Sequence, residues 1–89
     1  MTMLERKLLV CADNGLHAQA SAKVVQLLSH YGCSVSFILG SRAVNAKSIM
    51  GVMLLAAGPG KTITARAIGE DADQALDALE ALFQRKFEA

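Results

Sequence analysis

The sequence has no tryptophan and no unbroken apolar stretch of the ~18 residues that a membrane span requires. It also has no long run of like charge, since nine Lys and Arg are balanced by eight Asp and Glu, for a net charge of +1. These absences argue against membrane insertion and against a nucleic-acid-binding or membrane-surface patch. Residues 1–7 are charged where a signal peptide would need its apolar segment, so a cytoplasmic protein is expected.

Cysteine is also scarce: Cys11 and Cys33 are the only two, and both lie in apolar or strand-like settings. Buried, reduced thiols are the ordinary interpretation of such cysteines. The alternative is a metal site that adds His17 and His30, but the usual paired-cysteine spacings are missing. We therefore expect neither a metal nor a cofactor.

What the chain does have is apolar residues, which make up 53% of its 89 positions and suffice for the core of one domain over residues 1–89. Helical and alternating patterns predict the order β-α-β-β-α-β-α. The expected strands are 3–10, 33–39, 42–46 and 61–68, and the expected helices are 17–31, 48–57 and 71–86. This order predicts an α+β fold, an open-faced β-sandwich in which three helices cover one face of a four-stranded antiparallel sheet.

Local signals set the expected helix ends. Gly32 is placed as the C-terminal stop of the first helix, and Ser48 as the N-cap of the second. Asp71 and Gln74 have the spacing of a capping box at the start of the third. The second helix is apolar nearly all round, which in so small a domain favours an outward-facing docking patch over full burial.

One histidine stands at the start of the first expected helix. Asn14-Gly15 is a strong turn dipeptide, and it delivers His17 to a helix N-terminus, where amide groups and the helix dipole favour an anion. Histidine there is a competent nucleophile toward a phosphoryl group, although a plain helix-capping role is the alternative. Residues 58–62, Gly-Pro-Gly-Lys-Thr, resemble only the end of a nucleotide-binding loop and lead into a strand, so nucleotide binding there is disfavoured.

Two separated segments carry a family resemblance. Residues 14–23 resemble the active-site loop of HPr, the histidine-containing phosphocarrier of the bacterial phosphotransferase system, and residues 45–53 resemble its regulatory-serine segment. The resemblance implies that His17 accepts a phosphoryl group from enzyme I and passes it to enzyme IIA components of the sugar branch or a nitrogen-branch counterpart. In this scheme the protein is a carrier, not an enzyme, and Asn14 braces the loop.

The resemblance also implies regulation and further partners. Ser48 is the position that an HPr kinase/phosphorylase would phosphorylate in carbon catabolite regulation, with a transcriptional regulator as a further partner. The apolar docking face would comprise Ala18, Ala22, Val25, Ile49, Met50 and Met53. A carrier that exchanges partners quickly is expected to be a monomer.

Gln19 departs from the family pattern Gly-Leu-His-x-Arg, in which an arginine occupies this position. A neutral amide replaces a charged, forked donor, so slower phosphotransfer is expected. Two versions follow: a working phosphocarrier, which is favoured, or a regulatory paralogue that acts mainly through Ser48. A purely structural interaction module and a small-ligand sensor are alternatives of another class.

Overall fold

The computed structural model describes residues 3–10, 18–55, 58 and 60–87. Within these residues the elements follow the predicted order β-α-β-β-α-β-α. They are β1 (Met3–Leu9), α1 (Ala18–Leu28), β2 (Ser34–Leu39), β3 (Arg42–Asn45), α2 (Ile49–Leu55), β4 (Thr62–Ile68) and α3 (Ala72–Gln84). No helix among them is both long and apolar enough to span a bilayer.

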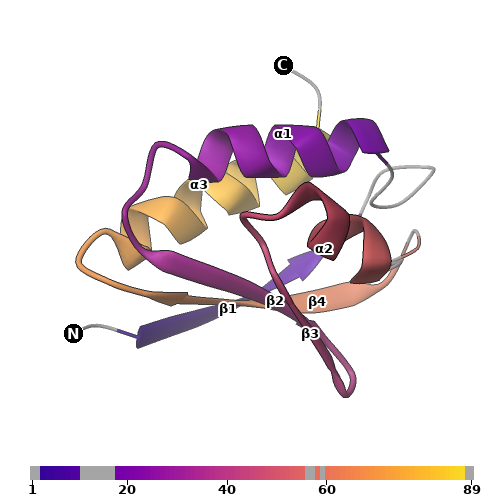
Figure 1. Ribbon diagram of the computed structural model, residues 1–89, viewed down its shortest axis with the longest axis horizontal. Coiled ribbons are helices and arrows are strands. Elements are labelled where there is room, and N and C mark those ends of the chain that lie inside the picture. Colours follow the sequence, from indigo (N-terminus) through magenta and orange to yellow (C-terminus); the bar gives the residue numbers. More distant parts are fainter. Residues whose placement is uncertain (1–2, 11–17, 56–57, 59, 88–89) are drawn as a thin grey trace.

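The described strands form one antiparallel sheet in the order β1-β4-β2-β3. Figure 1 shows the helices gathered on one side of this sheet, while its other side is uncovered. The predicted open-faced α+β architecture is therefore confirmed. β4, the last strand in the sequence, lies between β1 and β2 and pairs with both of them in the antiparallel direction.

Alternation along the strands decides which side chains enter the core. In β4, Ile63, Ala65 and Ala67 are fully buried beneath the helices, as the alternating pattern predicts. The two small alanine side chains leave room for the helices above the sheet. Phe37 of β2 occupies part of this space and contacts Phe83 of α3 edge-on, with ring centroids 6.0 Å apart. Each large apolar side chain buried in this layer contributes roughly 1.5–3 kcal/mol relative to exposure.

Apolar stripes on α1 and α3 face this core. On α1, Ala20, Val24 and Leu28 are buried, Leu27 is partly buried beside them, and Tyr31 is partly buried just after the helix. On α3 the buried stripe comprises Ala75, Leu76, Leu79, Leu82 and Phe83. The spacing of apolar residues thus located the inner face of both helices correctly.

The predicted end of α1 and the predicted capping box of α3 are wrong. α1 ends at Leu28, earlier than residue 31, and Gly32 does not adopt the left-handed conformation of a helix stop. Asp71 is the N-cap residue of α3, but its side chain makes no capping hydrogen bond. Both errors have one cause, because the Asp71 carboxylate instead accepts the backbone N–H groups of Gly32 (2.8 Å) and Cys33 (2.9 Å) and so draws that segment into β2.

Gly69 completes this junction between the β4–α3 loop and the start of β2. Its φ is +147°, and a Cβ there would lie 2.8 Å from both Cα and Cβ of Cys33. Only glycine allows the two backbones to approach this closely. The Asp71 hydrogen bonds then fix the contact from the other side of the junction.

Candidate functional site

The predicted reactive segment and the start of α1 adjoin in the sequence. Asn14 and His17 lie outside the described residues, whereas Ala18, which directly follows His17, is the first residue of α1. Ala18 and Gln19 are exposed, and Ala20 is only 1% exposed. The outer side of this first turn is therefore accessible, while its inner side anchors the helix. The first N–H groups of an α-helix point beyond its N-terminus, where the positive end of the dipole lies.

Ser48 lies directly before α2 and caps it as predicted. Its Oγ accepts the N–H of Gly51 at 3.2 Å, and its carbonyl accepts the N–H of Val52 at 3.0 Å. Gly51 permits the close approach of this turn to β3, since a Cβ there would lie 3.1 Å from the carbonyl oxygen of Asn45. Ser48 is half-buried, with the exposed Ile49 and Met50 following it in the chain.

The helix α2 has two different faces. Val52 and Leu55 are fully buried in the core. At the C-terminal end of the helix, Arg42 donates hydrogen bonds to the carbonyl groups of Leu54 and Leu55. The helix dipole stabilises a positive charge at this end. The short helix is therefore held at both ends, so the apolar residues on its outer face have a fixed place.

The helices α1 and α2 pack against each other on the same side of the sheet (Figure 1). Both helices have exposed apolar side chains. On α2, the exposed fractions are 44% for Ile49, 71% for Met50, 43% for Met53 and 60% for Leu54. On α1, Ala18 and Ala22 are exposed and Val25 is half-buried. We call these residues the α1–α2 face: Ala18, Ala22, Val25, Ile49, Met50, Met53 and Leu54.

Leu54 is a member of this face that the sequence reasoning did not single out. It lies four residues after Met50, so helical geometry places these two side chains on the same side. The signal was present in the nearly all-apolar pattern of residues 48–57, and buried Val52 and Leu55 identify the opposite side.

A second missed signal is the distribution of charge. Residues 14–69 contain no Asp or Glu, yet they contain the basic residues Lys23, Arg42, Lys47, Lys61 and Arg66. Neither α1 nor α2 includes an acidic residue. The described acidic residues lie instead on β1, on α3 and in the loop before α3. The helices α1 and α2 thus belong to a stretch of the chain that has five basic and no acidic residues.

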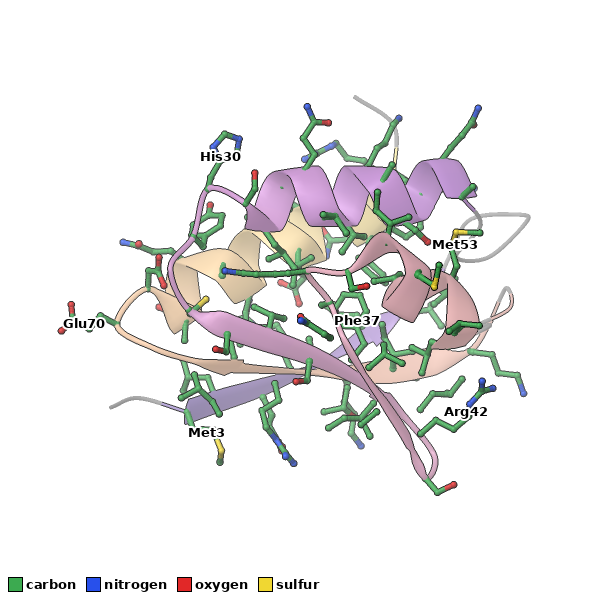
Figure 2. All side chains as sticks on the ribbon, in the orientation of Figure 1. Met3, His30, Phe37, Arg42, Met53 and Glu70 are labelled. Atoms are coloured by element: carbon green, nitrogen blue, oxygen red, sulfur yellow. The ribbon has the colours of Figure 1, made fainter. Side chains whose placement is uncertain are left out.

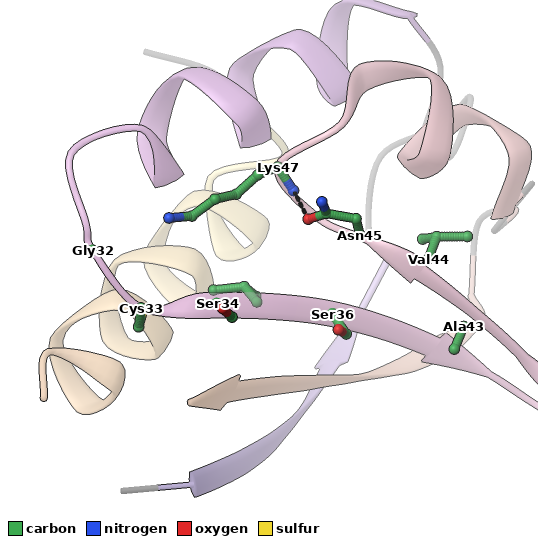
Figure 3. A pocket seen from close by; sticks show the side chains of 9 residues that line it. Gly32, Cys33, Ser34, Ser36, Ala43, Val44, Asn45 and Lys47 are labelled. Atoms are coloured by element: carbon green, nitrogen blue, oxygen red, sulfur yellow. Dashed lines mark hydrogen bonds between the residues drawn. The ribbon is translucent and has the colours of Figure 1, made fainter. Parts of the chain in front are cut away.

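A hollow of about 460 Å³ lies where β3 leaves β2, and Figure 3 shows the side chains that line it. Two of its polar side chains already bond within the protein: the Asn45 side-chain oxygen accepts the N–H of Lys47 at 2.9 Å, and Lys47 Nζ donates to the carbonyl of Tyr31 at 2.6 Å. None of the residues that line it belongs to the α1–α2 face.

Two of the residues considered for a metal site, Cys33 and His30, are described by the structure. Burial, followed by the nearby Asp71 carboxylate, raises the pKa of the Cys33 thiol, which keeps it protonated and unreactive. His30 is exposed just after the end of α1. Within the part of the chain that the structure describes, no three His, Cys, Asp or Glu residues come together as metal ligands.

The fold and this face define a class: an α+β carrier or interaction protein with an apolar helical surface adjoining position 17. Residues 4–85 match the family described as PTS HPr component phosphorylation site. The chain is 49% identical over 85 residues to the phosphocarrier protein HPr of Xylella fastidiosa (strain 9a5c), covering 96% of each chain. It is 42% identical over 88 residues to the phosphocarrier protein NPr of Shewanella violacea, covering 99% of this chain and 97% of that protein.

A solved structure agrees with these sequence matches. HPr-C-His from Thermoanaerobacter tengcongensis has a TM-score of 0.90 and 34% identity, with 94% of each chain covered. The chain belongs to the HPr family of phosphocarrier proteins.

Proposed function

We propose that the protein carries a phosphoryl group on His17, accepting it from enzyme I of the phosphoenolpyruvate-dependent phosphotransferase system. In the same proposal the group passes to an enzyme IIA component or to its nitrogen-branch counterpart, and residues 1–89 act as one unit. The observation that carries the proposal is the α1–α2 face, which has exposed apolar side chains on α2 and on the helix that begins directly after His17.

The chemistry at position 17 would use both parts of this surface. An imidazole nitrogen of His17 attacks the phosphorus, and the leaving group departs from the donor as the new N–P bond forms. The first turn of α1 favours the phosphoryl charge through its dipole and N–H groups. The apolar α1–α2 face holds the donor or acceptor in place, because burial of apolar surface drives protein association.

The charge distribution supports transient docking to an acidic partner. The region of residues 14–69 is free of acidic side chains, so an acidic surface would be attracted to it over a distance of about one Debye length. Such attraction raises association rates more than it raises affinity, which suits a carrier that must exchange partners.

Ser48 is the proposed site of regulatory phosphorylation by an HPr kinase/phosphorylase. A phosphate there would place negative charge next to the exposed Ile49 and Met50. Charge and hydration beside an apolar contact oppose docking, so phosphorylation would reduce the affinity for enzyme I.

One observation favours a second version, in which the protein is a regulatory paralogue that acts mainly through Ser48. Gln19, in the first turn of α1, occupies the position of the family arginine and cannot supply a positive charge. The two versions differ in whether His17 transfers its phosphoryl group at a useful rate.

The test of the proposed function is incubation with enzyme I and phosphoenolpyruvate, followed by mass spectrometry of the intact protein. The parent should gain one acid-labile phosphoryl group, and His17→Ala should gain none. The matched control is His30→Ala, which removes the exposed second histidine and should be labelled as the parent is. A His17→Ala protein labelled to the parental level would overturn the assignment of His17.

A further inference from the structure

All three described methionines lie on the surface. The exposed fractions are 57% for Met3, 71% for Met50 and 43% for Met53, and the described core contains no methionine. Exposure decides the chemistry of these residues, because a thioether is oxidised when the oxidant can reach its sulfur.

Two of the three lie on the docking side of the molecule. Met50 and Met53 are three residues apart on α2 and share the α1–α2 face with Ile49 and Leu54. Figure 2 shows Met53 in the helical layer and Met3 on the far side of the sheet. The chain therefore provides both a pair of reactive thioethers in the face and a similarly exposed one away from it.

We propose that Met50 and Met53 form an oxidation-sensitive site, at which peroxide-class oxidants convert the thioethers to sulfoxides and so weaken docking to enzyme I. This inference rests on the proposed function, since it requires that the α1–α2 face be the docking surface.

The chemical step balances with hydrogen peroxide as oxidant. A sulfur lone pair attacks one peroxide oxygen, an S–O bond forms and the O–O bond breaks. The sulfur is oxidised by two electrons, and the second oxygen leaves as hydroxide, which takes the proton of the transferred oxygen to become water. The product is a polar, chiral sulfoxide in place of a flexible apolar side chain.

The sulfoxide acts on docking and leaves the fold in place. Val52 and Leu55, which are both 0% exposed, anchor α2 from its buried side, and oxidation of Met50 and Met53 leaves these two anchors unchanged. A sulfoxide that is buried at an apolar contact must lose water without gaining a partner, which is unfavourable. Sulfoxide reductases reverse the modification, so the site can switch in both directions.

The experiment oxidises the full chain with hydrogen peroxide and maps each sulfoxide by peptide mass spectrometry. Affinity for enzyme I is then measured by calorimetry for the parent, for Met3→Leu and for the double variant Met50→Leu/Met53→Leu. Each protein is compared with its own unoxidised sample, so any effect of leucine itself on docking cancels. Circular dichroism before and after oxidation checks that the fold persists.

Oxidation should weaken binding about tenfold or more for the parent and for Met3→Leu. Oxidation should leave the affinity of the double variant for enzyme I unchanged. Treatment of the oxidised parent with sulfoxide reductase should restore its affinity for enzyme I. Equal affinity of oxidised and unoxidised parent, or an equal loss in the double variant, would overturn the inference. Failure of unoxidised parent to bind enzyme I would instead overturn the proposed docking function.

Discussion

Gln19 carries a neutral amide in the exposed first turn of α1, at the position where the family pattern has arginine. A hydrogen bond from a charged donor to a phosphoryl oxygen is roughly twice as strong as one from a neutral donor. In the transition state, replacing arginine by glutamine at this position therefore corresponds to a loss of ~1–3 kcal/mol of stabilisation of the phosphoryl oxygens.

We predict that Gln19→Arg accelerates phosphoryl transfer from phosphorylated enzyme I by about 10- to 100-fold, as measured by rapid-quench kinetics. The control is Gln26→Arg, which makes the same change of charge on an exposed site two turns further along α1. Equal rates for the parent and Gln19→Arg, or equal acceleration by both variants, would contradict the role given to position 19.

Asp71 is the second residue whose charge has a clear structural consequence. The hydrogen bond from the Gly32 backbone N–H, supported by those from the Cys33 side chain and backbone, lowers the pKa of this carboxyl below its usual value. A carboxyl with a lowered folded-state pKa stabilises the fold above its unfolded-state pKa. That contribution is lost as the pH falls through the folded-state pKa.

We therefore predict that Asp71→Asn lowers the free energy of unfolding at pH 7, and that the gap from the parent narrows as the pH falls below the ordinary aspartate pKa of about 3.9. Urea denaturation at several pH values measures this gap. Glu70→Gln, at the exposed neighbouring carboxylate, should show a much smaller gap at every pH. A gap for Asp71→Asn that does not change with pH would show that the charge of Asp71 is not what stabilises the junction.

The same residue shows why some local predictions fail. The spacing of Asp71 and Gln74 fits a capping box. The Asp71 carboxylate instead accepts hydrogen bonds from Gly32 and Cys33, which lie 39 and 38 positions earlier in the chain. A pattern within four residues cannot reveal a competing partner so far away. The unpredicted burial of Ser21 on α1 has no comparable signal, since its neighbours Ala20 and Ala22 offer little contrast.

At the scale of the element, α2 is the segment whose sequence pattern bears most directly on the proposed function. Its outward apolar face was predicted because a short helix in a small domain cannot bury every side. The structure confirms the exposure of Ile49, Met50 and Met53, and it adds the buried anchors Val52 and Leu55. The docking role of the face stays a prediction.

For α2 we predict that Ser48→Asp weakens binding to enzyme I about tenfold, or ~1.4 kcal/mol, in a calorimetric titration. Aspartate is itself a good N-cap, so the helix should persist and the melting temperature should change little. Ser41→Asp, in the exposed turn between β2 and β3, adds the same charge elsewhere and should bind as the parent does. Unchanged affinity of the Ser48→Asp protein would count against a regulatory role for Ser48.

Strands were predicted more closely than helix ends, for a physical reason. Alternation in β2 and β4 reports directly on which side chains face the core, as Val35, Phe37 and Ile63 show. The end of α1 instead depends on a tertiary hydrogen bond to Gly32. Helical periodicity alone therefore extended α1 beyond Leu28.

At the scale of the whole molecule, the element order indicated an antiparallel sheet covered on one side, but it did not specify the strand order β1-β4-β2-β3. Strand neighbours are set by long-range pairing, such as Glu5 with Arg66, whose side chains form an ion pair at 2.7 Å. The absence of acidic residues from residues 14–69 could also be predicted from the sequence, but only when acidic and basic residues are counted separately along the chain.

Together these features support one proposal: the α1–α2 face, in the part of the chain without acidic residues, brings a partner to the residue that precedes α1. We expect the uncovered side of the sheet, with Glu5, Lys7 and Arg66, to take no part in docking.

The most direct test is a titration of ¹⁵N-labelled protein with enzyme I, followed by amide chemical shifts. The account predicts that the largest changes occur in residues 18–25 and 48–54, and that the amides of Glu5, Lys7 and Arg66 change little. If the largest changes fell on the uncovered side of the sheet or along α3, the α1–α2 face would not be the docking surface.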